Sequence, residues 1–172
     1  NQGIGLSICQ SLSKEGVKCI MLARREDKLK DAITTLTGVG HKYYSIDLTK
    51  KSQVDALINK ILSKNKIEFC IHNVGGTLGF KTALSSLKEW EKVWHFNVGI
   101  AIQINNLIVP QMKSNKFGRI VHVSSISGES LRGSAPYGAS KAFLNAYTKV
   151  LGRDLAKENI IVSAVMPGAI FS

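Results

Sequence analysis

Short apolar runs alternate with amphipathic stretches along the whole chain, and this alternation limits the possible folds more than any other feature. Runs rich in β-branched and apolar residues predict strands at 17–24, 41–48, 67–74, 118–125 and 160–168. Apolar residues at helical spacing predict helices at about 4–15, 26–36, 51–64, 86–114 and 138–158. Strands that alternate with helices in this way predict an α/β fold, a doubly wound parallel sheet covered by helices on both faces in three layers.

Size and composition fit one domain. The chain has 172 residues, of which 44% are hydrophobic, and contains no linker-like stretch, so we expect residues 1–172 to form a single domain. No apolar run approaches the roughly 20 residues that span a bilayer, so we expect a soluble protein with no membrane partner. The three cysteines are an odd number placed inside predicted helices and strands, which favours reduced thiols in the cytoplasm.

The net charge of +11 raises the question of an acidic partner. The lysines are spread along helix-like stretches such as "KSQVDALINKILSKNK", and no basic cluster with interleaved aromatic residues is present. This pattern favours a solvated surface over a nucleic-acid site. The four histidines lie without ligand spacing, so we expect no metal site at His41, His72, His95 or His122.

Polar or glycine residues follow every predicted strand. The segments are "ARRE", "DLTK", "HNVGG", "SSISG" and "PGAIFS". The carboxyl ends of parallel strands meet at one edge of the sheet, where ligands of such folds bind. The five segments therefore predict one shared cleft.

A glycine turn opens the chain. Gly3, Ile4 and Gly5 directly precede an apolar helix-like stretch, a pattern typical of a turn that binds phosphate at a helix N-terminus. Such a turn normally follows a buried strand, and none precedes it here. We therefore expect this chain to be a portion of a longer protein, with the first and last strands of the sheet missing from it.

The segment "APYGASKAF" places Tyr137 and Lys141 four residues apart on one face of a predicted helix. A cation at about 4 Å interacts with a phenolate by about 4 kcal/mol at an effective dielectric constant near 20. That interaction is large enough to make a tyrosine useful for proton transfer near neutral pH. As an isolated pattern, Tyr-x-x-x-Lys occurs by chance in many helices.

The pair does not stand alone, because Ser124 and Ser125 end a predicted strand, Asn97 lies in the long helix, and the glycine turn and "HNVGG" precede them. Together these motifs resemble the short-chain dehydrogenase/reductase family over nearly the whole chain, with a general pattern similar to its 3-oxoacyl-acyl-carrier-protein reductases. The resemblance implies a Rossmann-type fold and hydride transfer between NAD(P)(H) and a carbonyl or alcohol carbon. The substrate would be a small molecule or a carrier-bound acyl group. A redox-silent regulator or scaffold that binds the dinucleotide is the alternative.

The resemblance also implies the catalytic roles. Tyr137 would be the general acid, or the base in the reverse direction, while Lys141 would favour its deprotonated form and bind the nicotinamide ribose. Asn97 would position a water that relays protons to the lysine. A serine would hold the substrate oxygen: its place after the strand selects Ser125, whereas the family's usual spacing to the tyrosine selects Ser124. We choose Ser125, with a one-residue deletion in the following loop.

The same resemblance assigns the cofactor contacts. They are the pyrophosphate turn Gly3, Ile4 and Gly5, the adenine contact Asp47, Asn73 and Gly75 beside the adenosine ribose, Tyr137 and Lys141, and the carboxamide segment Pro167, Gly168, Ile170 and Ser172. The chain departs from the family's "NNAG" element by carrying His72 at its first position.

Arg24 and Arg25 follow the predicted strand at 17–24, where a fold that prefers NAD usually has an acidic residue. An arginine presents a fork of donors that fits a 2′-phosphate. The sequence therefore favours NADP(H), with NAD(H) possible.

The stretch "VWHFNVGIAIQINNLIVPQM" is apolar around most of its circumference, so one sheet face cannot cover it. We expect a homodimer or homotetramer. The interface residues expected on two helices are Val98, Ile102, Leu107, Phe143, Ala146 and Val150.

Overall fold

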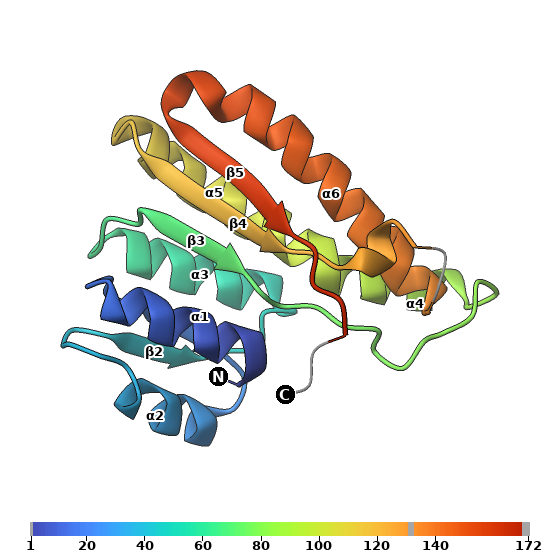
Figure 1. Ribbon diagram of the computed structural model, residues 1–172, viewed down its shortest axis with the longest axis horizontal. Helices are drawn as coiled ribbons and strands as arrows, with labels where there is room; N and C mark the ends of the chain where they lie inside the picture. Colours follow the sequence, from blue (N-terminus) through green and yellow to red (C-terminus); the bar gives the residue numbers. More distant parts are fainter. Residues whose placement is uncertain (1, 131–132, 170–172) are drawn as a thin grey trace. The chain divides into compact units, whose positions relative to one another are not determined.

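The computed structural model describes residues 2–130 and 133–169 (Figure 1). Parallel strands alternate with helices along the chain, which confirms the predicted α/β, Rossmann-like class. The strands are β1 (Ile20–Ala23), β2 (Lys42–Ser45), β3 (Phe69–His72), β4 (Gly118–Val123) and β5 (Ile160–Val165). The α-helices are α1 (Gly3–Lys14), α2 (Glu26–Thr34), α3 (Lys51–Leu62), α4 (Leu87–Trp94), α5 (Ile100–Ser114) and α6 (Ala135–Leu155).

The described residues form two compact units, one up to Val54 and one from Asp55 onward. In the first unit, β1 and β2 pair in parallel, from Ile20 opposite Lys42 to Ala23 opposite Ser45. Apolar residues of α1 and α2 cover this pair, and its core is built around buried Met21 and Leu29. The alternation of apolar and polar positions in the sequence accounts for which faces are buried.

The second unit contains a parallel sheet of order β3-β4-β5. Its register places His72 opposite His122 and Gly118 opposite Ile160. The central strand β4 is paired on both sides, and its Ile120 is fully buried. Such a strand needs a nearly continuous apolar run, which "GRIVHV" provides apart from the partly exposed Arg119 and the buried His122.

Among the described residues the strands form two parallel sheets, in agreement with a doubly wound sheet whose first strand is missing from this chain. The predicted sheet needs a further strand, ahead of the glycine turn, to join β1 and β3. No such strand occurs among residues 2–130 and 133–169.

The long helix predicted at 86–114 is divided by a π-helical turn, η1 (His95–Gly99), between α4 and α5. The Asn97 side chain donates to the carbonyl of Val93 at 2.8 Å, an acceptor that a regular α-helix gives to the backbone N–H of residue 97. Side chains inserted in this way disturb a helical ladder, and π-helical turns are often found at functional sites. Pro110 lies inside α5.

Val98, which the sequence predicts to lie in a subunit interface, is instead fully buried within its own unit. The prediction is wrong for this residue because η1 packs against α6 in the same unit. Phe143 and Val150 on α6 are about half exposed, and Phe143 makes an edge-on contact of 5.8 Å with the ring of Trp94. These exposed side chains form an apolar face on the second unit. In the described part of the chain, no helix is long and apolar enough to cross a membrane.

Candidate active site

The start of α6 fixes the Tyr137 and Lys141 pair. The Ser134 hydroxyl accepts a hydrogen bond from the backbone N–H of Tyr137 at 3.3 Å, and Pro136 stands in the first turn, as is favourable at a helix start. One turn later, the Lys141 Nζ lies 5.5 Å from the centre of the Tyr137 ring. The helix therefore brings the ammonium group beside the aromatic ring.

The Lys141 ammonium is held inside the second unit. The residue is 2% exposed, and its Nζ donates to the carbonyl of Val123 at the end of β4, at 2.8 Å. Burial lowers the pKa of Lys141 to about 8, because the charged form loses hydration. A buried cation stabilises negative charge on a neighbouring group more strongly than an exposed one would.

Asn97, also 2% exposed, connects η1 to the loop after β3. Its Nδ2 donates to the carbonyl of Gly76 at 2.8 Å, and its Oδ1 accepts from the Gly76 N–H at 2.9 Å. The side-chain amide is thus fully engaged with the backbone. This places the loop after β3 firmly against the π-helical turn.

Gly75 lies where the loop, Asn97 and Lys141 meet. A Cβ added to Gly75 would stand 2.6 Å from Asn97 Oδ1 and 2.9 Å from Lys141 Nζ. Both distances are shorter than real Cβ contacts, so only glycine fits here without displacing Asn97 or Lys141. Asn73, two residues earlier, is exposed. The loop thus approaches Asn97 and Lys141 with its backbone rather than with side chains.

The two serines at the end of β4 differ in their surroundings. The Ser124 hydroxyl donates to the backbone carbonyl of Lys141 at 3.4 Å, so it faces α6. The Ser125 hydroxyl accepts from the N–H of Ser127 at 3.1 Å and caps a short 3₁₀ turn, η2 (Ile126–Gly128). This bond uses an oxygen lone pair and leaves the hydroxyl hydrogen of Ser125 to donate.

The segment after β5 contacts the same region. The N–H of Ile126 donates to the carbonyl of Pro167 at 3.2 Å, and a Cβ added to Gly168 would lie 3.6 Å from Ile126 Cδ1, an ordinary contact distance. The structure therefore brings Pro167 and Gly168 beside Ser125. Ile170 and Ser172 lie outside the described residues.

In the first unit, Gly3, Ile4 and Gly5 form the first turn of α1. The N-cap residue Gln2 gives no side-chain hydrogen bond to the helix, and the first turn contains no acidic residue. Gly3 has a φ of 53°, a conformation that favours glycine. A helix start with uncapped N–H groups and no negative charge is suited to bind a phosphate.

Arg24, Arg25 and Asp47 follow the strands of the first unit. Arg24 is exposed directly after β1, and Arg25 donates to the side-chain oxygen of Gln2. The Asp47 carboxylate accepts from the N–H and the hydroxyl of Thr49, at 3.0 and 2.8 Å. These bonds lower the pKa of Asp47, with smaller contributions from Lys50 and Arg24. Asp47 thus organises the turn after β2.

Sequence reasoning missed a buried polar cluster in the second unit, made of His72, Asn105, His122, Tyr147 and Thr148. Its members come from four different elements, so their spacing in the sequence gave no pattern. The only signal was His72, the departure within "HNVGG". In the described part of the chain, no three His, Cys, Asp or Glu side chains gather as possible metal ligands.

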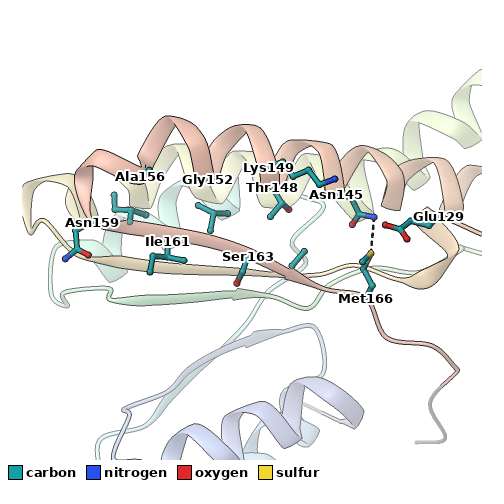
Figure 2. Close-up of a pocket in the computed structure, with 13 residues that line it drawn as sticks. Glu129, Asn145, Thr148, Lys149, Gly152, Ala156, Asn159, Ile161, Ser163 and Met166 are labelled. Atoms are coloured by element: carbon teal, nitrogen blue, oxygen red, sulfur yellow. Dashed lines mark hydrogen bonds between the residues drawn. The ribbon is translucent and has the colours of Figure 1, made fainter.

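A groove of about 680 Å³ runs along α6 and β5, as Figure 2 shows. Asn145 and Met166 are joined by a hydrogen bond of 3.4 Å at one end of it. None of its lining residues is a predicted catalytic or cofactor-binding residue. The groove is therefore separate from the site around Lys141.

The sequence pattern of the short chain dehydrogenase family matches residues 1–172. An uncharacterised oxidoreductase of Staphylococcus epidermidis is 26% identical over 172 residues, which cover 99% of this chain and 74% of the relative. Two solved structures are each 28% identical to this chain and match 98% of its length. One is NAD⁺-bound xylitol dehydrogenase, with a TM-score of 0.90. The other is L-sorbose reductase from Gluconobacter frateurii in complex with NADPH and L-sorbose, with a TM-score of 0.91. This chain spans 67% and 66% of those two proteins.

The fold, the arrangement around Lys141 and the family match all point to the same family. The chain belongs to the short-chain dehydrogenase family, a family of oxidoreductases.

Proposed function

We propose that this protein transfers a hydride between NADP(H) and a carbonyl or alcohol carbon of a small-molecule substrate, with Tyr137 as general acid and base. The observation that carries the proposal is the buried Lys141 ammonium beside the Tyr137 ring, held by the carbonyl of Val123. A buried lysine with no acidic partner in its hydrogen bond is costly for the fold, which is typical of a functional group.

In the direction of reduction, the Tyr137 hydroxyl donates its proton to the substrate oxygen as that oxygen gains negative charge. The phenolate that remains is stabilised by the Lys141 cation, whose attraction is strong because the lysine is buried. A nicotinamide bound at this site supplies or accepts the hydride. In the direction of oxidation, the same phenolate removes the proton from the alcohol.

Ser125 and Asn97 have supporting roles in this proposal. The Ser125 hydroxyl keeps a hydrogen that can bind the substrate oxygen, whereas the Ser124 hydroxyl is directed at the backbone of α6, so we retain Ser125 as the catalytic serine. The Asn97 side chain is occupied by Gly76 and Val93. A relay water at Asn97 would therefore bind its main-chain carbonyl, in a π-helical turn where the regular ladder is interrupted.

Taken separately, the residues of each unit fit a part of a dinucleotide. The uncapped start of α1, with Gly3, Ile4 and Gly5, would hold the pyrophosphate, and Asp47 would accept from the adenine amino group. Gly75 would let the loop after β3 approach the cofactor, together with Asn73. Lys141 would donate to the nicotinamide ribose, and Pro167 and Gly168, with Ile170 and Ser172, would face the carboxamide.

The test of this function is a carbonyl panel with the full-length protein. We expect carbonyl-dependent oxidation of NADPH for at least one class among small ketones, sugars, steroids and acyl thioesters. The net charge of +11 favours including acyl groups on an acidic carrier protein. Cofactor binding with no turnover across the panel would instead support the redox-silent regulator or scaffold, against which the intact Tyr137 and Lys141 pair argues.

Replacing Arg24 by Ala is expected to weaken NADPH about ten- to a hundredfold and to leave NADH nearly unchanged. Arg24 is exposed at the end of β1, and a charge-assisted hydrogen bond to a 2′-phosphate is worth about 1.5–3 kcal/mol. Titration of both cofactors into both proteins measures the effect. Lys28→Ala is a matched control, because this exposed cation lies on α2 beyond the strand end. Equal losses for the two cofactors would contradict the assignment, as would a wild type that prefers NADH.

We also propose a homo-oligomer, dimer or tetramer, built on the apolar face that Phe143, Ala146 and Val150 form on α6, together with Ile102 and Leu107 of α5. Phe143 and Val150 are 46% and 47% exposed, which is unfavourable for large apolar side chains in water. Sedimentation of the full-length protein should show an assembly, and Val150→Glu should weaken it. A monomer at micromolar concentration would refute this proposal.

The three thiols, none of which is in a disulfide, support a reducing compartment such as the cytoplasm.

A further inference from the structure

A buried polar cluster lies outside the catalytic residues but on the elements that carry them. His72 ends β3, immediately before the loop that contains Gly75, and His122 lies opposite it on β4 with the two rings stacked at 5.1 Å. Asn105 lies on α5 and Thr148 on α6. His122 and Asn105 are 0% and 1% exposed. None of these side chains has a role in the chemistry proposed above.

The hydrogen positions on His122, Asn105 and His72 follow from one hydroxyl. Thr148 Oγ1 donates its single hydrogen to the carbonyl of Leu144 at 2.7 Å, so it can only accept from His122 Nδ1, which lies 2.8 Å away. His122 therefore carries its hydrogen on Nδ1. As a neutral imidazole, it has a bare Nε2 that accepts from Asn105 Nδ2 at 3.3 Å.

The donor and acceptor roles of the hydrogen bonds beyond Asn105 follow in the same way. With Nδ2 facing His122, the Asn105 Oδ1 faces His72 and accepts from its Nε2 at 2.7 Å. The second hydrogen of Nδ2 goes to the hydroxyl of Tyr147 at 3.2 Å. A proton added to His122 Nε2 would meet the Asn105 amide hydrogens, and turning the amide over would bring them against His72. With the Asn105 amide oriented as in the structure, the bonds are all satisfied only when His122 is neutral.

The pKa shifts in and beside the cluster are consistent with a neutral His122. Burial lowers the pKa of His72 to about 4 and that of His122 to about 3, with His72 and Lys141 adding repulsion for His122. Burial raises the pKa of Cys70, whose Sγ lies 3.4 Å from His72 Nε2, to about 12, and it also raises the pKa of Tyr147. Between about pH 5 and 9, the cluster therefore keeps one protonation state.

The cluster and Lys141 share two structural elements. His122 directly precedes Val123, whose carbonyl binds the Lys141 ammonium, and Thr148 lies seven residues after Lys141, on the same side of α6. Two hydrogen bonds thus join β4 to α6. Lys141 donates to the carbonyl of Val123, and His122 donates to the hydroxyl of Thr148. A shift of α6 along β4 would break both.

We propose that the His72–Asn105–His122–Thr148 cluster is a positioning network, which fixes α6 on β4 and thereby sets the place of the Lys141 ammonium. This inference rests on the proposed function for its catalytic consequence, but the placement of Lys141 can be measured without turnover. Thr148 is a positioning residue here, because it acts on the reaction only through His122 and Lys141.

The test compares Thr148→Val with Thr148→Ser in the full-length protein. Valine keeps the shape of threonine but leaves His122 Nδ1–H without an acceptor, whereas serine keeps the hydroxyl. The titration of Lys141 is followed by NMR of labelled lysine, assigned with Lys141→Met. We expect a midpoint near the pKa of about 8 in wild type and in Thr148→Ser, and an upward shift of about half a pH unit or more in Thr148→Val.

We also expect kcat to fall about tenfold or more in Thr148→Val and to stay close to wild type in Thr148→Ser, because small displacements of a catalytic group are costly. Histidine ¹⁵N spectra of wild type should show hydrogen on Nδ1 of His122 and on Nε2 of His72; the opposite placement on His122 would overturn the inference. It would also be overturned if Thr148→Val lowered Tm but left the Lys141 midpoint unchanged. A shifted midpoint in a protein without turnover would retain the network and refute the proposed function alone.

Discussion

Replacing Tyr137 by Phe is expected to lower kcat by about 10²–10⁴, the usual effect of losing a general acid. Phenylalanine keeps the ring that lies beside Lys141 and removes only the hydroxyl, so the ammonium retains its neighbour. Affinity for NADPH should change little. Steady-state kinetics and cofactor titration of the purified full-length variant measure the two effects.

A suitable control is Tyr147→Phe, which removes a hydroxyl from the next tyrosine of α6 and one hydrogen bond to Asn105. It should retain far more activity than Tyr137→Phe, because Tyr147 is not placed beside the reacting groups. A Tyr137→Phe variant that kept more than a tenth of the wild-type kcat would contradict the assignment of the acid.

Replacing Lys141 by Met should abolish most turnover and also weaken NADPH. The variant loses the cation that stabilises the tyrosinate and the donor proposed for the nicotinamide ribose. We expect kcat/KM to fall by about 10³ or more, since both effects add. Equal NADPH affinity in wild type and Lys141→Met would refute the ribose contact.

Lys141→Met should lower activity but should not lower the free energy of unfolding at pH 7. A pKa lowered to about 8 means that folding keeps Lys141 charged at pH 7 at a cost of about 3 kcal/mol. That cost is complete below pH 8 and decreases as the pH rises towards the unfolded pKa, because only the unfolded chain then still binds the proton. Methionine removes the cost and also the bond to Val123, worth about 1–3 kcal/mol.

Lys141→Met should therefore be at least as stable as wild type at pH 7, and its advantage should shrink between about pH 8 and 10. Denaturant unfolding at pH 7 and 9.5 measures this directly. A large loss of stability at pH 7 would show that Lys141 mainly supports the fold, and would weaken the functional reading of its burial.

The sequence predicted the order and type of the elements because each one carries a periodic apolar pattern. It also predicted that Tyr137 and Lys141 share a helix face, since that depends on local spacing alone. The π-helical turn was not predictable, because it results from the contact of the Asn97 side chain with the Val93 carbonyl. Periodicity does not report such a contact.

The buried polar cluster shows more clearly which residues cannot be predicted from the sequence pattern. His72 and His122 are fifty residues apart in the sequence and become neighbours only through the pairing of β3 with β4. Asn105 reads as part of an apolar helix, and its buried amide has meaning only beside the two rings. Residues whose role depends on long-range pairing cannot be found from local pattern, whereas the motif at Tyr137 and Lys141 can.

The measurement that tests the central claim most directly is the transfer of deuterium from NADPH deuterated at both C4 positions to the carbonyl carbon of a substrate from the panel. Wild type should form an alcohol labelled on that carbon, detected by mass spectrometry. Tyr137→Phe, with cofactor and substrate saturating, should form the same product at least a hundredfold more slowly. An unlabelled product from wild type, or equal labelling rates in the two proteins, would contradict hydride transfer assisted by Tyr137.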